Sequence, residues 1–302
     1  MINPKVMIQR SLAGESVTNI LEGSGRTFCF YHSADLDGHC SGAIVKHNHP
    51  ECELIGINYQ DKFPWDKIED GDKVFMVDFS IDSKDMKKLN DLADFVWIDH
   101  HTTSIEANKG TKFEGIQQVG KAACELCAEY FEMNVVDGIK LLSTYDVWND
   151  EDKEYWESKV LPFHYGMMKN EDTRPENSDE LWNEVFEGYS DFIEDTIKDG
   201  KIILAYENAQ NAAYMRAYGF EAEIAGKKVL VANRGMTGSQ LFESMWDPGK
   251  FEMMVTFCKG KDGWKVGLYT TREDVDCGAI AKSLGGGGHR QAAGYSTKQC
   301  PF

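Results

Sequence analysis

The chain has 302 residues, 42% of them hydrophobic and 27% charged, which is typical of a globular protein long enough for two domains. Its 50 Asp and Glu residues outnumber 32 Lys and Arg residues, and a net charge of −18 argues against long duplex DNA as a partner. No apolar run reaches the length of a membrane span, so we expect no membrane partner.

Strands alternate with helices in the first half of the sequence. We expect strands at residues 27–31, 53–59, 73–77 and 94–98, with helices near 40–47 and 83–92. This order predicts an α/β fold with a doubly wound, mainly parallel sheet, in which ligands gather at the carboxyl ends of the strands. Two more helices, at 119–131 and 135–148, should close a first domain that spans residues 27–150.

The second half has a different character. Residues 151–217 lack strand signals, and 193–217 have helical periodicity despite Gly200, so this segment is expected to be a helical connector. Short strands at 222–224, 228–232, 252–258 and 264–270, followed by a helix at 277–284, predict a smaller second α/β domain that spans 218–302.

The N-terminal residues and the cysteines bear on the cellular location. Residues 1–26 form an N-terminal extension in which charged residues interrupt any apolar core of a secretory signal. The eight cysteines are spread widely, unlike those of a disulfide scaffold, so we expect reduced thiols and a cytoplasmic enzyme. Cys124 and Cys127 form a lone Cys-x-x-Cys pair, which we interpret as core packing. A homodimer stays open, because the sequence is silent on oligomeric state.

Carboxylates and imidazoles gather at four element ends. They are His32, Asp35 and Asp37; Asp78; Asp99, His100 and His101; and Asp146. Asp35 and Asp37 alternate in an extended stretch before Gly38, so they face one point, and an ionised pair so close requires a cation. Asp and His ligands without thiolates suit Mn²⁺ best. Two divalent ions could hold a bridging hydroxide and polarise a phosphoryl group, which predicts phosphate ester hydrolysis.

A glycine run, Gly285–Gly288, precedes His289 and Arg290 near the C-terminus. Consecutive glycines expose backbone N–H groups and let an anion approach closely, so the functional interpretation is a grip for a phosphate or carboxylate. The alternative for such a run is a flexible loop.

Together these motifs resemble the DHH phosphoesterase superfamily over nearly the whole chain. The matching residues are Asp-Leu-Asp-Gly at 35–38, Val-Asp at 77–78, Asp-His-His at 99–101 and Asp146. Gly-Gly-Gly-His-x-x-Ala-Ala-Gly at 286–294 resembles the signature of the DHHA1 domain. The resemblance implies a catalytic DHH domain at 27–150, joined by the connector to a substrate-binding DHHA1 domain at 218–302.

The resemblance also implies roles for individual residues. One metal would be held by His32, Asp35 and Asp78, and the other by Asp37, Asp78, His100 and Asp146. Asp99 would orient a neighbouring histidine, while His101 would contact the substrate phosphate or help to protonate the leaving oxygen. His32 precedes Asp35 by three residues, whereas many members place four between the corresponding positions. A backbone hydrogen bond at the end of a strand is the alternative role for His32.

Substrate binding is assigned to the second domain by the same resemblance. The residues implied are Arg272, Gly286, Gly287, Gly288, His289 and Arg290. Arginine suits bidentate contact with phosphate, but Arg272 could instead be a surface residue paired with Glu273 or Asp274. Arg234 could also face a cleft.

The branch that the chain resembles most is that of the bacterial nanoRNases. This predicts Mn²⁺-dependent hydrolysis of a short oligoribonucleotide or dinucleotide to mononucleotides. Alternatives on the same site are a cyclic mono- or dinucleotide phosphodiesterase, a phosphomonoesterase and a polyphosphate hydrolase. An alternative of another class is a non-catalytic nucleotide sensor. A long-strand exonuclease of the RecJ type ranks low, since no basic track is visible.

Overall fold

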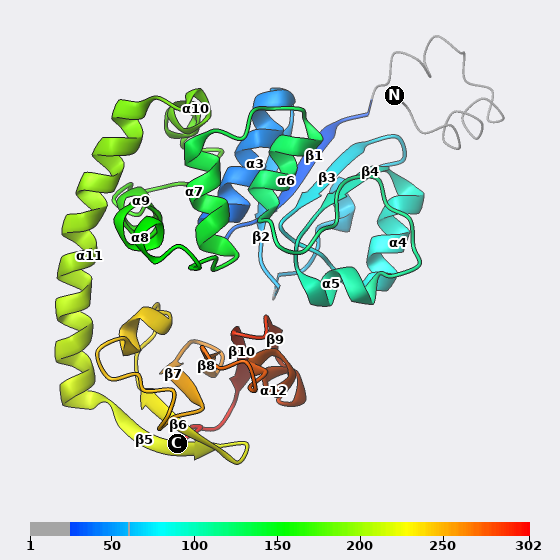
Figure 1. The fold of residues 1–302 in the computed structure, drawn as a ribbon. Coiled ribbons are helices and arrows are strands. Elements are labelled where there is room, and N and C mark those ends of the chain that lie inside the picture. Colours follow the sequence, from blue (N-terminus) through cyan, green and yellow to red (C-terminus); the bar gives the residue numbers. More distant parts are fainter. Residues whose placement is uncertain (1–24, 60) are drawn as a thin grey trace, which may run out of the picture. The chain divides into compact units, whose positions relative to one another are not determined.

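The computed structural model describes residues 25–59 and 61–302, which divide into two compact units. The first unit extends to Lys201, and the second comprises Ile202–Phe302. Helix α11 (Ser190–Tyr218) contains the division, which falls inside the expected connector (Figure 1). The expected N-terminal extension lies outside the described residues, apart from its last two positions. Within the described ranges, no helix is both long and apolar enough to cross a bilayer.

The first unit is built on a four-stranded, wholly parallel sheet with the strand order β2-β1-β3-β4. Its strands are β1 (Thr27–His32), β2 (Glu53–Ile57), β3 (Lys73–Val77) and β4 (Asp94–Ile98). The strands fall where the sequence predicted them, except that β1 ends one residue late and β2 ends two residues early. From β1 the chain first adds β2 on one side and then β3 and β4 on the other, so the switch point lies between β1 and β3. In such sheets the switch point opens a crevice at the carboxyl ends of the strands.

Helices cover both faces of this sheet, as the doubly wound prediction required (Figure 1). Helices α3 (Leu36–Asn48) and α6 (Ala123–Tyr130) lie on one face, with α7 (Asp137–Asp146) packed on both of them. Helices α4 (Ser83–Leu92) and α5 (Thr102–Ala107) lie on the other. Alternate strand residues such as Phe30, Met76 and Trp97 are buried in one core cluster with Met86 and Leu89 of α4.

The rest of the first unit is helical, as predicted for the connector. It contains α8 (Lys153–Tyr155), a π-helical turn (Trp156–Val160), α9 (Leu161–Met167), α10 (Asp179–Glu187) and the start of α11. Gly200 is tolerated inside α11 because α9 crosses it closely: a Cβ atom at Gly200 would lie 1.7 Å from the carbonyl oxygen of Pro162. Gly166 of α9 makes the reciprocal close approach to Thr196.

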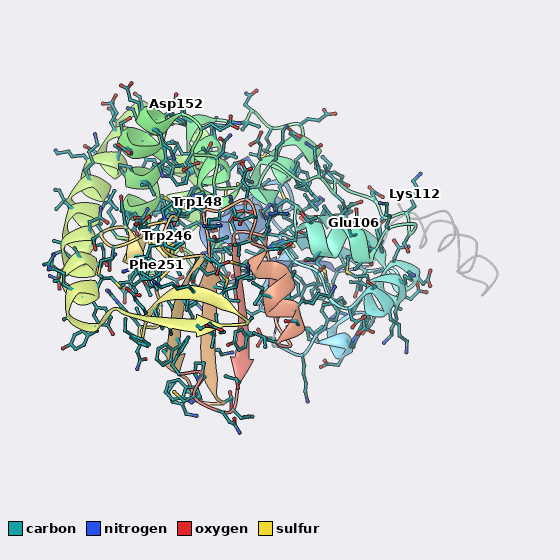
Figure 2. All side chains as sticks on the ribbon, turned by 60° about the horizontal axis from the view of Figure 1, so that its bottom comes forward. Glu106, Lys112, Trp148, Asp152, Trp246 and Phe251 are labelled. Atoms are coloured by element: carbon teal, nitrogen blue, oxygen red, sulfur yellow. The ribbon has the colours of Figure 1, made fainter. Side chains whose placement is uncertain are left out.

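The second unit is a six-stranded mixed sheet with the order β5-β6-β7-β8-β10-β9. Its elements are β5 (Phe220–Ile224), β6 (Lys227–Ala232), β7 (Met253–Lys259), β8 (Trp264–Tyr269), α12 (Cys277–Ser283), β9 (Gly287–Gly288) and β10 (Ala292–Thr297). Helix α12 packs on one face through Cys277 and Ala281. On the other face, Met215 of α11 joins a cluster that includes the stacked rings of Trp246 and Phe251 (Figure 2).

The cysteines behave as predicted. All eight are free thiols, and Cys124 and Cys127 are fully buried in α6. Burial raises the pKa of both thiols well above its ordinary value. These two residues therefore act as small core side chains.

Candidate metal centre

The Asp and His residues that were predicted as metal ligands meet at one edge of the sheet of the first unit. His32 ends β1, Asp78 follows β3, and the Asp99–His101 stretch follows β4. The carboxyl ends of parallel strands lie together, so these three segments converge there. Asp146, the last residue of α7, reaches the same place, with its carboxylate 3.3 Å from the imidazole of His100.

Two groups of side chains share Asp78. In the first, the Nδ1 atom of His32 lies 2.9 Å from Oδ2 of Asp35 and 3.5 Å from Oδ2 of Asp78. In the second, Nε2 of His100 lies 3.3 Å from Oδ1 of Asp78 and 3.7 Å from Oδ2 of Asp37. The two carboxylate oxygens of Asp78 thus face different histidines.

The Asp35–Asp37 stretch is not extended as predicted, because α3 begins at Leu36, and its two carboxylates belong to different ligand groups. The side chain of Asp35 caps α3 by accepting a hydrogen bond from the N–H of Gly38 at 3.0 Å. Position 38 admits only glycine, since a Cβ atom there would lie 1.9 Å from the carbonyl oxygen of His32. The buried carboxylate of Asp37 accepts the N–H groups of Ala123 and Cys124, at 2.9 and 2.7 Å, where α6 begins.

Asp78 itself is held in an uncommon conformation. Its φ of +53° lies in the left-handed region, which non-glycine residues rarely adopt, and such outliers cluster at functional sites. The backbone N–H of Asp78 donates to the carbonyl of Ile98 at 2.9 Å, which ties the end of β3 to the end of β4. This conformation places a carboxylate that is only 1% exposed between the two groups.

Asp99 organises the Asp-His-His stretch rather than facing the first group. Its Oδ1 atom accepts the backbone N–H groups of His100 and His101 and lies 2.7 Å from Nδ1 of His101. A hydrogen bond from Nδ1 to this carboxylate would leave Nε2 of a neutral His101 as the acceptor nitrogen. These contacts hold the ring of His101 in one orientation.

The concentration of carboxylates makes the histidines basic. Burial opposes a charge on His32, but its contacts with Asp35 and Asp78 outweigh that cost and raise its pKa to about 11. Burial likewise opposes a charge on His100, yet Asp78, Asp146 and Asp37 raise its pKa to about 10. Burial, followed by the neighbouring carboxylates, raises the pKa of Asp37. In the protein without metal ions, bound protons therefore offset part of the negative charge of the carboxylates.

The donor set fits divalent cations. Nδ1 of His32 and Oδ1 of Asp78 are buried and make no hydrogen bond of normal geometry to any described residue, although other polar atoms lie within 3.5 Å of each. Buried polar atoms rarely lack partners, and close but misaligned contacts are expected when ligands point at a shared ion instead of at one another. Asp and His side chains form three overlapping groups, and the ligand atoms within each group lie within 4.8 Å of one another.

Tyr59 also lies beside this cluster, which its position in the sequence did not predict. Tyr59 was assigned to the end of a strand, but β2 stops at Ile57 and Tyr59 lies in the following loop. Its ring centroid is 5.5 Å from that of His32 and 6.3 Å from that of His101. An aromatic residue just after a strand was the only available signal.

The arginines assigned to substrate binding already have partners within the second unit. The guanidinium of Arg272 donates to both carboxylate oxygens of Asp274, at 2.9 and 2.6 Å, and to the carbonyl of Pro248. This is the ion pair that the sequence left open as the alternative. Arg290 donates to the carbonyl of Glu273. Arg234 donates to the side chain of Asn211 at 2.8 Å.

The glycine run forms part of a hairpin instead of a loose loop. Gly287 and Gly288 make up β9, which pairs antiparallel with β10. Gly288 has a φ of +136°, and a Cβ atom there would lie 2.6 Å from the Cα atom of Ala293. The exposed His289 follows, with its N–H donated to the carbonyl of Ala292 at 2.7 Å. Close packing of two strands thus accounts for Gly288.

Solved structures share the fold of this chain at low identity. A pGpG-specific phosphodiesterase, PggH from Vibrio cholerae, is 12% identical with a TM-score of 0.50, over 90% of this chain and 94% of that one. An exopolyphosphatase-related protein from Bacteroides fragilis is 11% identical with a TM-score of 0.50, over 99% and 93%. No protein-family model and no curated protein matches the sequence. At such identities the likeness establishes the fold: a mixed α/β chain with a parallel first sheet and a second sheet.

Proposed function

We propose that the chain is a metal-dependent phosphoesterase of the DHH superfamily that hydrolyses phosphodiester bonds in very short RNA. The observation that carries the proposal is the pair of ligand groups on either side of Asp78. One cation would be held by His32, Asp35 and Asp78, and the other by Asp37, Asp78, His100 and Asp146. Two divalent ions in such a site polarise phosphoryl oxygens and activate water for in-line attack. Mn²⁺ suits this mixture of carboxylates and imidazoles.

The chain's own residues would perform the remaining tasks. Asp78 directs one oxygen at each group, which supports a bridging role. Asp99 fixes the ring of His101 and favours its protonated form, in which the other ring nitrogen could donate to a phosphoryl oxygen or supply the proton that the leaving oxygen needs. Asp37 is locked by the N–H groups of α6, which limits reorganisation of the site when substrate binds.

The descriptions of the structural neighbours guide the choice of substrate class. One structural neighbour is described as specific for pGpG, a dinucleotide, which favours a linear dinucleotide among the very short RNAs. The other is described as exopolyphosphatase-related, so polyphosphate is the second candidate. Both ligands would present a phosphoryl group to the cations that these carboxylates would hold.

The test is a cleavage assay on metal-stripped protein resupplied with Mn²⁺. Its panel contains RNA di- to pentanucleotides, pGpG, a cyclic dinucleotide, cyclic AMP, polyphosphate, pyrophosphate and a long single strand, with products separated by chromatography. We expect fastest cleavage of the shortest RNAs, abolished in Asp146→Asn and retained in Asp91→Asn, an exposed carboxylate of α4. Cleavage of polyphosphate alone would replace the proposed substrate, and no turnover with any panel member would support a nucleotide sensor.

A further inference from the structure

Tyr59 is exposed in an unusual setting. Its side chain is 57% exposed, although large aromatic rings usually gain from burial. One side of the ring packs against the proposed site: the centroid lies 4.8 Å from that of Phe79 and 5.5 Å from that of His32. The ring of Tyr59 also contacts His101 edge-on, so Tyr59 lies at the border of the proposed site. Tyr59 therefore combines contact with two histidines of the cluster and a large surface left open to a ligand.

The loop that carries Tyr59 is anchored beside the cluster. The side-chain amide of Asn58 donates to Oγ of Ser33 at 3.0 Å, and Ser33 directly follows His32. The N–H of Asn58 donates to the carboxylate of Asp61 at 2.8 Å, and the N–H of Asp61 returns to the carbonyl of Asn58 at 2.9 Å. These bonds tie Tyr59 to the end of β1, so its place at the border is built by the fold.

The side chain of Tyr59 is mainly aromatic carbon, and more than half of it is open to a ligand beside the cluster. An aromatic ring suits the flat face of a nucleobase, which every base presents and which stacks on tyrosine. An inorganic phosphate chain has no such face and could use only the hydroxyl group.

We propose that Tyr59 determines specificity at the metal centre by stacking on a nucleobase whose phosphate is held at the adjacent cluster. The inference rests on the proposed function and narrows it, because it selects nucleotide esters over polyphosphate and pyrophosphate. A nucleobase is separated from its phosphate by one sugar, and Tyr59 lies just outside the ring of histidines and carboxylates. The role is one of binding, without participation in bond cleavage.

The test compares two ligands that differ only in the base. AMP and ribose 5-phosphate are titrated calorimetrically into Mn²⁺-loaded protein, for the wild type and for Tyr59→Phe, Tyr59→Leu and Tyr189→Leu. Tyr189 is 58% exposed and directly precedes α11, a helix that contributes no residue to the ligand groups, so it is the matched control. Circular dichroism and Mn²⁺ affinity verify that each variant retains the fold and the metal site.

We expect wild type, Tyr59→Phe and Tyr189→Leu to bind AMP more tightly than ribose 5-phosphate by the same factor. In Tyr59→Leu this factor should be about tenfold smaller. An undiminished preference in Tyr59→Leu, no preference in the wild type, or an equal loss in Tyr59→Phe would overturn the stacking role. If the wild type cleaves no RNA but Tyr59→Leu loses the preference for AMP, the proposed function is refuted and the base-binding role is kept. If the wild type cleaves short RNA but Tyr59→Leu keeps the preference for AMP, the base-binding role is refuted and the proposed function is kept.

Discussion

The two regions to which the sequence assigned function differ in how their polar groups are satisfied. In the first unit, buried atoms of His32 and Asp78 lack normal hydrogen bonds to described residues, although they lie close to other ligands. In the second, Arg272 and Arg290 donate to Asp274 and to Glu273, which lie in the segment between β8 and α12. Buried polar atoms that converge without pairing are suited to bind a cation, whereas groups that already pair must exchange partners before they can bind a substrate.

The largest expected effect tests the first half of this contrast. Asp78→Asn keeps the size of the side chain but removes the charge shared by both ligand groups. Replacement of groups that merely orient ligands costs about 10- to 100-fold, so loss of this carboxylate should lower kcat/KM by more than about 100-fold. Steady-state assays at saturating Mn²⁺ would check it. Wild-type activity in Asp78→Asn, with the fold verified by circular dichroism, would refute a central role for Asp78.

A pH dependence of metal binding should follow from the raised histidine pKa values. His32 and His100, with pKa values of about 11 and 10, carry protons at neutral pH in the metal-free protein, and metal ligation requires their neutral forms. Protons therefore compete with Mn²⁺, and the affinity should rise with pH by about tenfold per unit for each proton displaced. Calorimetry in buffers of different ionisation enthalpy would count these protons.

The matched control for this titration is His47→Gln, because His47 is an exposed residue of α3 outside the cluster. It should release as many protons as the wild type. Uptake of protons on Mn²⁺ binding, or an affinity that falls as the pH rises toward 10, would show that the cluster is not the binding site.

In the second unit, the packing role of the glycine run can be separated from ligand binding. Gly288→Ala would place a Cβ atom 2.6 Å from Ala293 at a φ of +136°, whereas Gly287 has open space around its position. We expect Gly288→Ala to lower the free energy of unfolding by about 1–3 kcal/mol and Gly287→Ala to change it little. Urea unfolding of the full chain would measure both. Equal stabilities would contradict the hairpin geometry.

The sequence predicted the first unit well because its elements carry strong local signals. The strands at 73–77 and 94–98 are continuous apolar runs, and Asp82 caps α4 as a polar residue ahead of a helical pattern should. The hairpin of β9 and β10 was missed, since glycine, alanine and serine have weak strand propensity. Contacts between distant segments, such as Asp37 with the start of α6, leave no local pattern in a single sequence.

Tyr59 illustrates a different limit of prediction. Its residue type suits the end of an alternating strand, so nothing local placed it in a loop. The bonds that fix this loop run from Asn58 to Ser33, across the β1–β2 edge of the sheet. A residue whose role depends on such a tertiary anchor becomes visible only in the folded chain.

The smallest expected effect tests whether Arg272 can leave its partner. If Arg272 binds the substrate phosphate, Asp274 competes for the guanidinium, and Asp274→Ala should lower KM while Arg272→Gln raises it. Exposed ion pairs contribute roughly 0.2–1 kcal/mol, so the decrease in Asp274→Ala should be only about 1.5- to 5-fold. The opposite shifts in KM, at unchanged kcat, distinguish a substrate contact from a structural pair. If neither Arg272→Gln nor Asp274→Ala changes KM, Arg272 has only a structural role, through its hydrogen bond to the carbonyl of Pro248.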